Sequence, residues 1–238
     1  MLNGLYSGAS AQNVLAKKQE LISSNLMHIN SSGHRRLLPA VNQRFELDNA
    51  DATIDLGPEV ESVRTDFTPG RVAQTNRPLD VAIRGDGFFV FDDAGRDYLS
   101  RNGRLFRDPA TNTLVNDKGF PIQGETGPIT IEPTVQDRDV TIASDGTVSA
   151  GGVLLGKIQA RAYTDNQTLT SVDVTGFRPG DDSVVSDESV AISQREHELS
   201  NVQPVSELVN LIVNSRQTEA VQKASRAISD TLREHIRE

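Results

Sequence analysis

Glycine and phenylalanine are confined to the middle of this chain, and this distribution limits what it can fold into. All eight Phe lie between Phe45 and Phe177, and 15 of the 18 Gly lie within residues 45–193. No glycine follows Gly180. Because Gly serves turns and aromatic residues favour strands, the middle is expected to be β-rich, while the glycine-poor ends suit helices.

The N-terminal zone predicts a helix from about Leu2 to about Ile29. Apolar residues that recur at spacings of three, four and seven lie on one stripe: Ala11, Leu15, Ile22, Leu26 and Ile29. Leu2, Leu5 and Ala9 extend an apolar face at the start. Gly33 follows a polar run and can adopt a left-handed conformation, so we expect it to end the helix.

The C-terminal zone predicts a longer helix that starts at Pro204, because proline suits a first helical position. Its stripe follows near-heptad steps: Leu208, Leu211, Thr218, Val221, Ile228, Leu232 and Ile236. Ile212 is assigned to the same expected assembly interface. Such stripes are usually the core-facing sides of ordinary helices. Both stripes here are narrow, which is typical of coiled coils. The two helices are therefore expected to pair with each other or with helices of neighbouring subunits.

The middle zone has the pattern of a mainly β domain with short, mostly antiparallel strands and Gly/Pro-rich turns. Val140–Ile142 and Thr147–Ser149 flank Asp145-Gly146, a hairpin signal. Residues 34–59 show no clear period and are interpreted as an extended arm. The expected divisions are an N-terminal helix (1–33), an arm or linker (34–67), a central β domain (68–193) and a C-terminal helix (194–238).

Composition excludes several function classes. The net charge is −9, distributed as +4 over residues 1–44, −12 over 45–193 and −1 over 194–238. An acidic middle argues against a nucleic-acid platform. The absence of cysteine excludes a disulfide framework or a thiol nucleophile. No apolar run approaches the roughly 18 residues of a membrane span, and the N-terminus lacks the pattern of a cleaved signal peptide.

The stretch LDVAIRGDGFFVF, residues 79–91, resembles the start of a nucleotide site because a strand runs into Gly85-x-Gly87. A dinucleotide site needs a third glycine and a following helix, but Val90 occupies the third position and the sequence continues as a strand. The turn is therefore expected to join two strands. Alternation along the second strand should send Phe89 and Phe91 to one face and Phe88 to the other.

The sequence offers no catalytic, cofactor or metal residue. His28, His34, His197 and His235 are not paired at ligand spacing. The acid pairs at residues 92–93 and 181–182 lack calcium-loop spacing. An enzyme that uses the Gly85–Gly87 turn and a soluble binding module with a helical-hairpin handle remain alternatives.

Three stretches resemble the axial proteins of the bacterial flagellum, specifically the basal-body rod proteins. SNLMHINSSGHRR, which contains Asn25 and Gly33, resembles the family's NNLAN-x-x-T-x-GFKR signature. The stretch from Thr68 to Phe89 resembles the T-x-G-x-L-x-x-T-x-x-PLDVAI-x-G-x-GFF block through Pro78, Leu79, Asp80, Gly85, Gly87, Phe88 and Phe89. SNVQPVSELVNLI, with Asn201 and Val202, resembles the SNV…ELVNMI block. Met27-His28 and His34 depart from the signature, and residues 164–193 match no family segment.

This resemblance implies a structural subunit without enzymatic activity. Residues 127–149 are closest to the F-type proximal rod proteins, and the G-type distal rod proteins and short hook proteins are alternatives. The family's terminal helices pack around a central channel, its β domain faces outward, and its subunits are exported unfolded without a cleaved signal. The implied partners are copies of the chain, other rod proteins, hook and ring proteins and the flagellar export apparatus, in the rod that crosses the periplasm. Neither nucleic-acid binding nor membrane insertion is expected.

Overall fold

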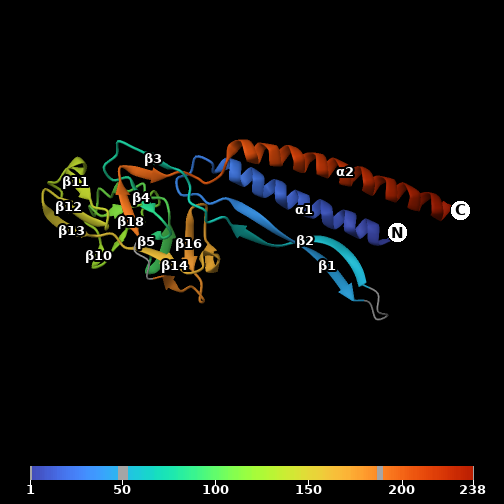
Figure 1. The fold of residues 1–238 in the computed structure, drawn as a ribbon, viewed down its shortest axis with the longest axis horizontal. Coiled ribbons are helices and arrows are strands. Elements are labelled where there is room, and N and C mark those ends of the chain that lie inside the picture. Colours follow the sequence, from blue (N-terminus) through green and yellow to red (C-terminus); the bar gives the residue numbers. More distant parts are fainter. Residues whose placement is uncertain (1, 48–52, 187–189, 238) are drawn as a thin grey trace. The chain divides into compact units, whose positions relative to one another are not determined.

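The computed structural model describes residues 2–47, 53–186 and 190–237, with side chains described for residue 4 and for residues 6–43, 57–186 and 190–231. It is mainly β with one helix near each end (Figure 1). The chain forms two compact units. Unit 1 comprises Met1–Met27, Arg36–Asp66 and Gln203–Glu238, and unit 2 comprises His28–Arg35 and Phe67–Val202.

Unit 1 consists of two long helices and one hairpin. Helix α1 spans Leu2–Met27, and helix α2 spans Pro204–Arg237. The predicted start at Pro204 is confirmed, whereas α1 ends two residues before the predicted Ile29. The helices run antiparallel, so that the two ends of the chain lie at the same end of unit 1 (Figure 1).

The hairpin of unit 1 pairs β1 (Leu37–Leu47) with β2 (Thr53–Thr65) in antiparallel register. These strands lie within residues 34–67, which the sequence suggested to be an extended arm. The register shifts at Ala40/Val41 and again at Arg44/Phe45. Each shift moves the following side chains to the other face, which explains why no period of two is visible in this segment.

Unit 2 holds the remaining strands, and every pairing found among the described residues is antiparallel. Its largest sheet has the order β15-β16-β6-β5-β14-β17, with bounds β15 Leu169–Ser171, β16 Gly176–Pro179, β6 Arg96–Ser100, β5 Phe88–Asp93, β14 Ala160–Tyr163 and β17 Val185–Ser186. A second sheet has three strands: β11 Val140–Ile142, β12 Thr147–Ala150 and β13 Val153–Lys157.

Two-stranded pairs complete unit 2. They are β3 Val72–Gln74 with β19 Glu196–Glu198, β4 Val81–Arg84 with β18 Ala191–Gln194, β7 Phe106–Arg107 with β8 Leu114–Val115, and β9 Gln123–Gly124 with β10 Gly127–Pro128. Two short 3-10 helices lie at Asp137–Asp139 and Asn166–Thr168. Strands β18 and β19 precede α2, so unit 2 ends where the C-terminal helix begins.

The core of unit 2 lies on both faces of β5. Phe89 and Phe91 pack into one buried cluster, and Phe88 and Val90 pack into another. The predicted alternation is therefore confirmed. Because a buried cluster covers each face of β5, its sequence begins with a continuous apolar run instead of alternating with polar residues.

The Gly85–Gly87 turn carries the chain from one sheet to another. Strand β4 pairs with β18, whereas β5 pairs with β6 and β14. Both glycines have positive φ, 94° at Gly85 and 142° at Gly87. A Cβ on Gly87 would lie 2.8 Å from the side chain of Val190. The turn needs glycine for its backbone geometry, which is the structural role that the sequence favoured.

Truncating the buried β5 core should destabilise unit 2. Replacing Phe89, which is fully buried, with Ala is expected to lower the free energy of unfolding by about 3–5 kcal/mol because it removes a phenyl ring and leaves a cavity. Urea titration followed by tyrosine fluorescence measures this effect, because Tyr98 and Tyr163 are buried in this unit. Phe106→Ala, on the exposed β7, is the matched control and should cost clearly less. Equal losses would contradict the assignment of the core.

Candidate functional site

The two helices of unit 1 contact each other through small and polar groups. The Asn214 side-chain amide donates to the Leu15 backbone carbonyl at 3.0 Å, and Gln12 donates to Ser225 at 3.4 Å. Opposite Ser225 lies Gly8, where a Cβ would lie 2.8 Å from the serine hydroxyl oxygen. A stripe of small residues thus lets the helix backbones approach closely.

The side of α2 that is turned inward is unusually polar. Its buried or half-buried positions among the described side chains are Glu207, Asn210, Leu211, Asn214, Thr218, Val221, Ser225, Ile228 and Ser229. Six of these nine side chains are polar. Helix pairing in unit 1 therefore buries little apolar surface from α2, and buried apolar surface is the main source of packing free energy.

The opposite side of α2 is apolar and exposed, and we call it the outer stripe. It consists of Val205, Leu208, Val209, Ile212 and Val213, which are 47% to 74% exposed. Spacings of three, four, seven and eight place these side chains on one face of the helix. A contiguous apolar face of this kind marks an interaction surface.

The structure distributes the residues predicted for helix assembly over three environments. Leu15 is buried, and Ile22, Leu26, Ile29, Leu211, Val221 and Ile228 are half-buried, whereas Ala9, Leu208 and Ile212 are exposed. Ile29 lies beyond the end of α1, within unit 2. The side chains of Leu5 and Leu232 lie outside those that the structure describes. Periodicity alone did not separate the inward face of α2 from the outer stripe.

Asn25, one of the motif residues, joins α1 to the hairpin of unit 1. It is buried, and its side chain both donates to the Leu37 carbonyl at 3.0 Å and accepts from the Leu37 amide at 2.9 Å. An asparagine side chain can imitate a neighbouring strand in this way, because it carries one donor and one acceptor group. Asn25 therefore sets where β1 begins beside the helix.

The motif residues of unit 2 hold its first segment, His28–Arg35, against the β core. Gly33 has φ 71°, and a Cβ there would lie 2.5 Å from the backbone nitrogen of Asn102. Gly33 lies six residues beyond the end of α1, so it enables this close approach instead of ending the helix as predicted. Asn201 donates to the Thr68 carbonyl at 2.9 Å, and Val202 beside it is buried.

The Pro78-Leu79-Asp80 motif is internal to unit 2. Leu79 packs in the core, and the buried Asp80 is 3.1 Å from Arg77. The Pro78 carbonyl accepts a hydrogen bond from Gln194 at 2.7 Å. These residues are structural parts of unit 2 and expose no reactive group.

A buried carboxylate, which the sequence analysis did not single out, organises the same region. Glu198 accepts from Arg35 at 2.7 Å, from the Gly70 amide at 2.6 Å and from Arg101 at 3.3 Å. All three charged side chains are almost fully buried, and burial lowers the pKa of Arg101 to about 10. No local pattern reveals the network because its members are far apart along the chain.

His34 adds a neutral polar contact to this region. Its Nδ1 is 2.8 Å from the Val174 carbonyl, so Nδ1 carries the proton and donates. Its ring lies 5.3 Å from that of His28. Burial lowers the pKa of His34, as do the charges of His28 and Arg35, while the Val174 bond opposes the shift. Burial also lowers the pKa of His197 in the same unit.

Within residues 2–47, 53–186 and 190–237, no cluster of three or more His, Asp or Glu side chains is arranged to hold a metal ion. Neither helix within those ranges is long and apolar enough to cross a membrane. The candidate site therefore consists of the exposed outer stripe of α2 and of buried polar contacts that hold each unit together.

Removing the charge of Glu198 should strongly destabilise unit 2. Glu198→Gln would leave two buried guanidinium groups without a counter-charge, and we expect a loss of about 3–5 kcal/mol in unfolding free energy by urea titration. Glu196→Gln is the matched control on the same strand, because its partner Arg84 is exposed and such pairs contribute at most about 1 kcal/mol. A Glu198→Gln protein as stable as the control would show that the network is dispensable.

Unit 2 should lose stability as the pH falls from about 7.5 to about 5.5. Both His34 and His197 have folded-state pKa values below the unfolded value of 6.5, so the unfolded chain binds protons first. Each histidine can contribute a slope of at most about 1.4 kcal/mol per pH unit. Urea titrations across this range measure the slope, and His34→Asn, which keeps a donor for Val174, should flatten it. Stability that rises on acidification would refute the assignment.

Comparison with known proteins places both units within one family. The model for the flagellar hook protein FlgE/F/G D1 domain matches residues 82–150, which lie in unit 2. The model for the flagellar basal body rod FlgEFG protein C-terminal region matches residues 194–237, which include α2.

Relatives that match over nearly their whole length indicate which group within the family this chain belongs to. The flagellar basal-body rod protein FlgF of Caulobacter vibrioides is 31% identical over 94% of this chain and 92% of its own length. FlgF of Salmonella typhimurium is 28% identical over 97% of this chain and 95% of its own length. The rod protein FlgG of Bacillus subtilis is 26% identical over 99% of this chain and 98% of its own length. Because this similarity extends over nearly all of both chains, the chain belongs to the family of flagellar basal-body rod proteins, in its FlgF group.

Proposed function

We propose that this chain polymerises through its terminal helices and so forms part of the hollow shaft that transmits torque from the motor to the hook. The single observation that carries the proposal is the outer stripe of α2. Its five apolar side chains are exposed, while the inward side of the same helix is mostly polar. A helix built in this way gains most of its burial from contacts with other subunits.

The free energy available from burying the outer stripe favours assembly over an isolated helix pair. Fully burying one Val, Leu or Ile side chain contributes about 1.5–3 kcal/mol. Covering five partly exposed ones would supply several kcal/mol for each subunit contact. Coiled-coil pairing of the terminal helices with those of neighbouring subunits would supply this cover.

The proposed organisation follows the sequence divisions. The helices α1 and α2, which lie within the divisions 1–33 and 194–238, form the axial part, residues 34–67 connect it, and residues 68–193 form a β domain that faces outward. The helix-assembly residues are those predicted from the sequence, among which Leu208 and Ile212 are exposed and ready for contact. The Asn25, Gly33 and Asn201 contacts support a structural role for the family motifs.

Partners and location follow from the relatives, whose names describe rod and hook proteins. We propose copies of the chain and other rod proteins as neighbours, hook and ring proteins as further partners, and delivery by the flagellar export apparatus without a cleaved signal peptide. The proposed location is the basal body where it crosses the periplasm. The proposed role is mechanical and requires no bond chemistry.

A charge placed on the outer stripe should block incorporation without unfolding the chain. Ile212→Glu and Leu208→Glu are each expected to reduce the amount of chain in purified hook–basal bodies at least about ten-fold, because assembly would bury a carboxylate without a partner. Immunoblots of hook–basal bodies from cells that express the variant in place of the natural chain measure this amount.

Leu154→Glu is the matched control, because Leu154 is also an exposed leucine, on β13 of unit 2. It should incorporate normally, and all three variants should melt as the unmodified chain does. Normal incorporation of Ile212→Glu, or an equal loss in Leu154→Glu, would argue against assembly through α2.

A further inference from the structure

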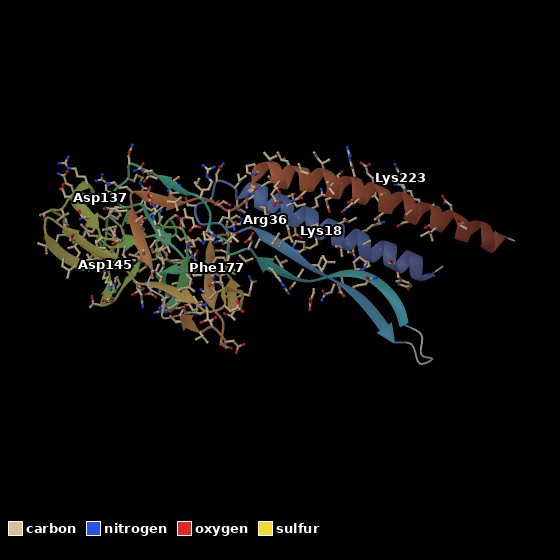
Figure 2. The ribbon with its side chains drawn as sticks, viewed as in Figure 1. Lys18, Arg36, Asp137, Asp145, Phe177 and Lys223 are labelled. Atoms are coloured by element: carbon tan, nitrogen blue, oxygen red, sulfur yellow. The ribbon has the colours of Figure 1, made fainter. Side chains whose placement is uncertain are left out.

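Unit 1 contains a partly enclosed pocket between α1, α2 and the start of β1, which we call the helix–hairpin pocket. Its volume is about 260 Å³, and its polar lining includes Lys18, Arg36, Glu207, Asn214 and Gln217. Figure 2 shows Lys18 on α1 and Arg36 at the start of the hairpin. Val213 belongs both to the pocket lining and to the outer stripe, so the two surfaces adjoin.

Two buried acceptor atoms in this pocket have no donor among the described residues. Asn214 is only 3% exposed and uses its amide nitrogen to bind Leu15, while its side-chain oxygen accepts no hydrogen bond. Glu207 is 1% exposed, and its Oε1 is 2.5 Å from Arg36 Nε, whereas its Oε2 accepts no hydrogen bond. Buried acceptors without partners are costly, so they point to a donor that arrives from outside unit 1.

The charges that line the pocket restrict what that donor can be. Lys18 and Arg36 are positive and Glu207 is negative, which leaves a net charge of +1. A second ammonium or guanidinium group would be repelled by this balance. A carboxylate would be attracted to Lys18 but would bring more acceptors to Asn214 and Glu207. A neutral group with both a donor and an acceptor satisfies all of these side chains.

We propose that the helix–hairpin pocket receives the carboxamide of an Asn or Gln side chain from an adjoining axial subunit. This inference rests on the proposed assembly through α2, because a subunit seated on the outer stripe meets the pocket at Val213. The carboxamide NH₂ donates to the Asn214 and Glu207 oxygens, and its carbonyl accepts from Lys18. The volume is sufficient for this group and a few waters, each of which needs about 30 Å³.

Blocking the pocket from its rim tests whether it is occupied. Gln217 is exposed and lines the pocket, so Gln217→Trp fills the opening without removing a buried partner. We expect at least a roughly ten-fold loss of the chain from purified hook–basal bodies. Gln217→Ala, the matched control at the same position, leaves the pocket open and should stay within about two-fold of the unmodified chain. Equal incorporation of both variants would show that only water fills the pocket, and the proposal would fail.

Changing the charge of Lys18 tests the chemistry of the occupant. Lys18→Met removes a charge and Lys18→Glu reverses it, so the pocket's net charge becomes 0 and −1. A carboxamide loses the Lys18 donor in both variants, so incorporation should fall by no more than about ten-fold and by the same factor, within about three-fold, in the two variants. A further loss of about ten-fold or more in Lys18→Glu relative to Lys18→Met would identify an anionic occupant, and a comparable gain would identify a cationic one. Either result would overturn the assignment.

Failure of this inference is distinguishable from failure of the proposed function. If the unmodified chain is absent from hook–basal bodies, assembly itself is wrong. If the unmodified chain is present and Ile212→Glu is lost while Gln217→Trp is retained, assembly stands and the pocket proposal falls. Melting curves of the purified full-length variants confirm that each one folds.

Discussion

The contact between α1 and α2 is the constraint on which unit 1 depends, because it joins the two ends of the chain. Asn214 and Leu15 are bonded across 199 residues of sequence. Bringing such distant segments together costs loop-closure entropy, which rises with the length of the intervening chain. Few apolar side chains of α2 offset this cost, since its inward face carries Glu207, Asn214, Thr218 and Ser225. The helix pair is thus specified by polar contacts and close backbone approach more than by apolar burial.

Polar residues at such positions set register at the expense of stability. Here the register is set by Asn214 on Leu15, Gln12 on Ser225 and Gly8 beneath Ser225. The apolar residues that would make a strong internal seam lie on the outer stripe instead. This division allows one helix to keep a defined partner inside the subunit and still offer an apolar face to its neighbours.

Unit 2 relies on a different physical basis. Its sheet buries aromatic side chains on both faces of β5, and its first segment is held by Glu198 between two arginines. A buried carboxylate with several charge-assisted bonds fixes geometry, because breaking any one of them leaves an uncompensated charge. Gly33 permits the close backbone approach that this network requires.

Local patterns predicted much of this protein. Helical periodicity located both terminal helices, Pro204 marked the start of α2, Asp145-Gly146 marked a hairpin, and alternation assigned Phe88 and Phe89 to opposite faces. The motif stretches indicated the family. These features depend on residues that are neighbours in sequence, so they can be predicted from the sequence alone.

Tertiary structure alone decided the rest. Two register shifts hid the β1–β2 hairpin from any period-of-two pattern. Which face of α2 is buried depends on where α1 lies. Periodicity cannot reveal this, because the buried face is polar and close-packed while the exposed face is apolar. The Glu198 network and the helix–hairpin pocket join residues that are up to about 200 positions apart. Their roles depend on burial and on long-range contacts, and both arise only when distant segments meet.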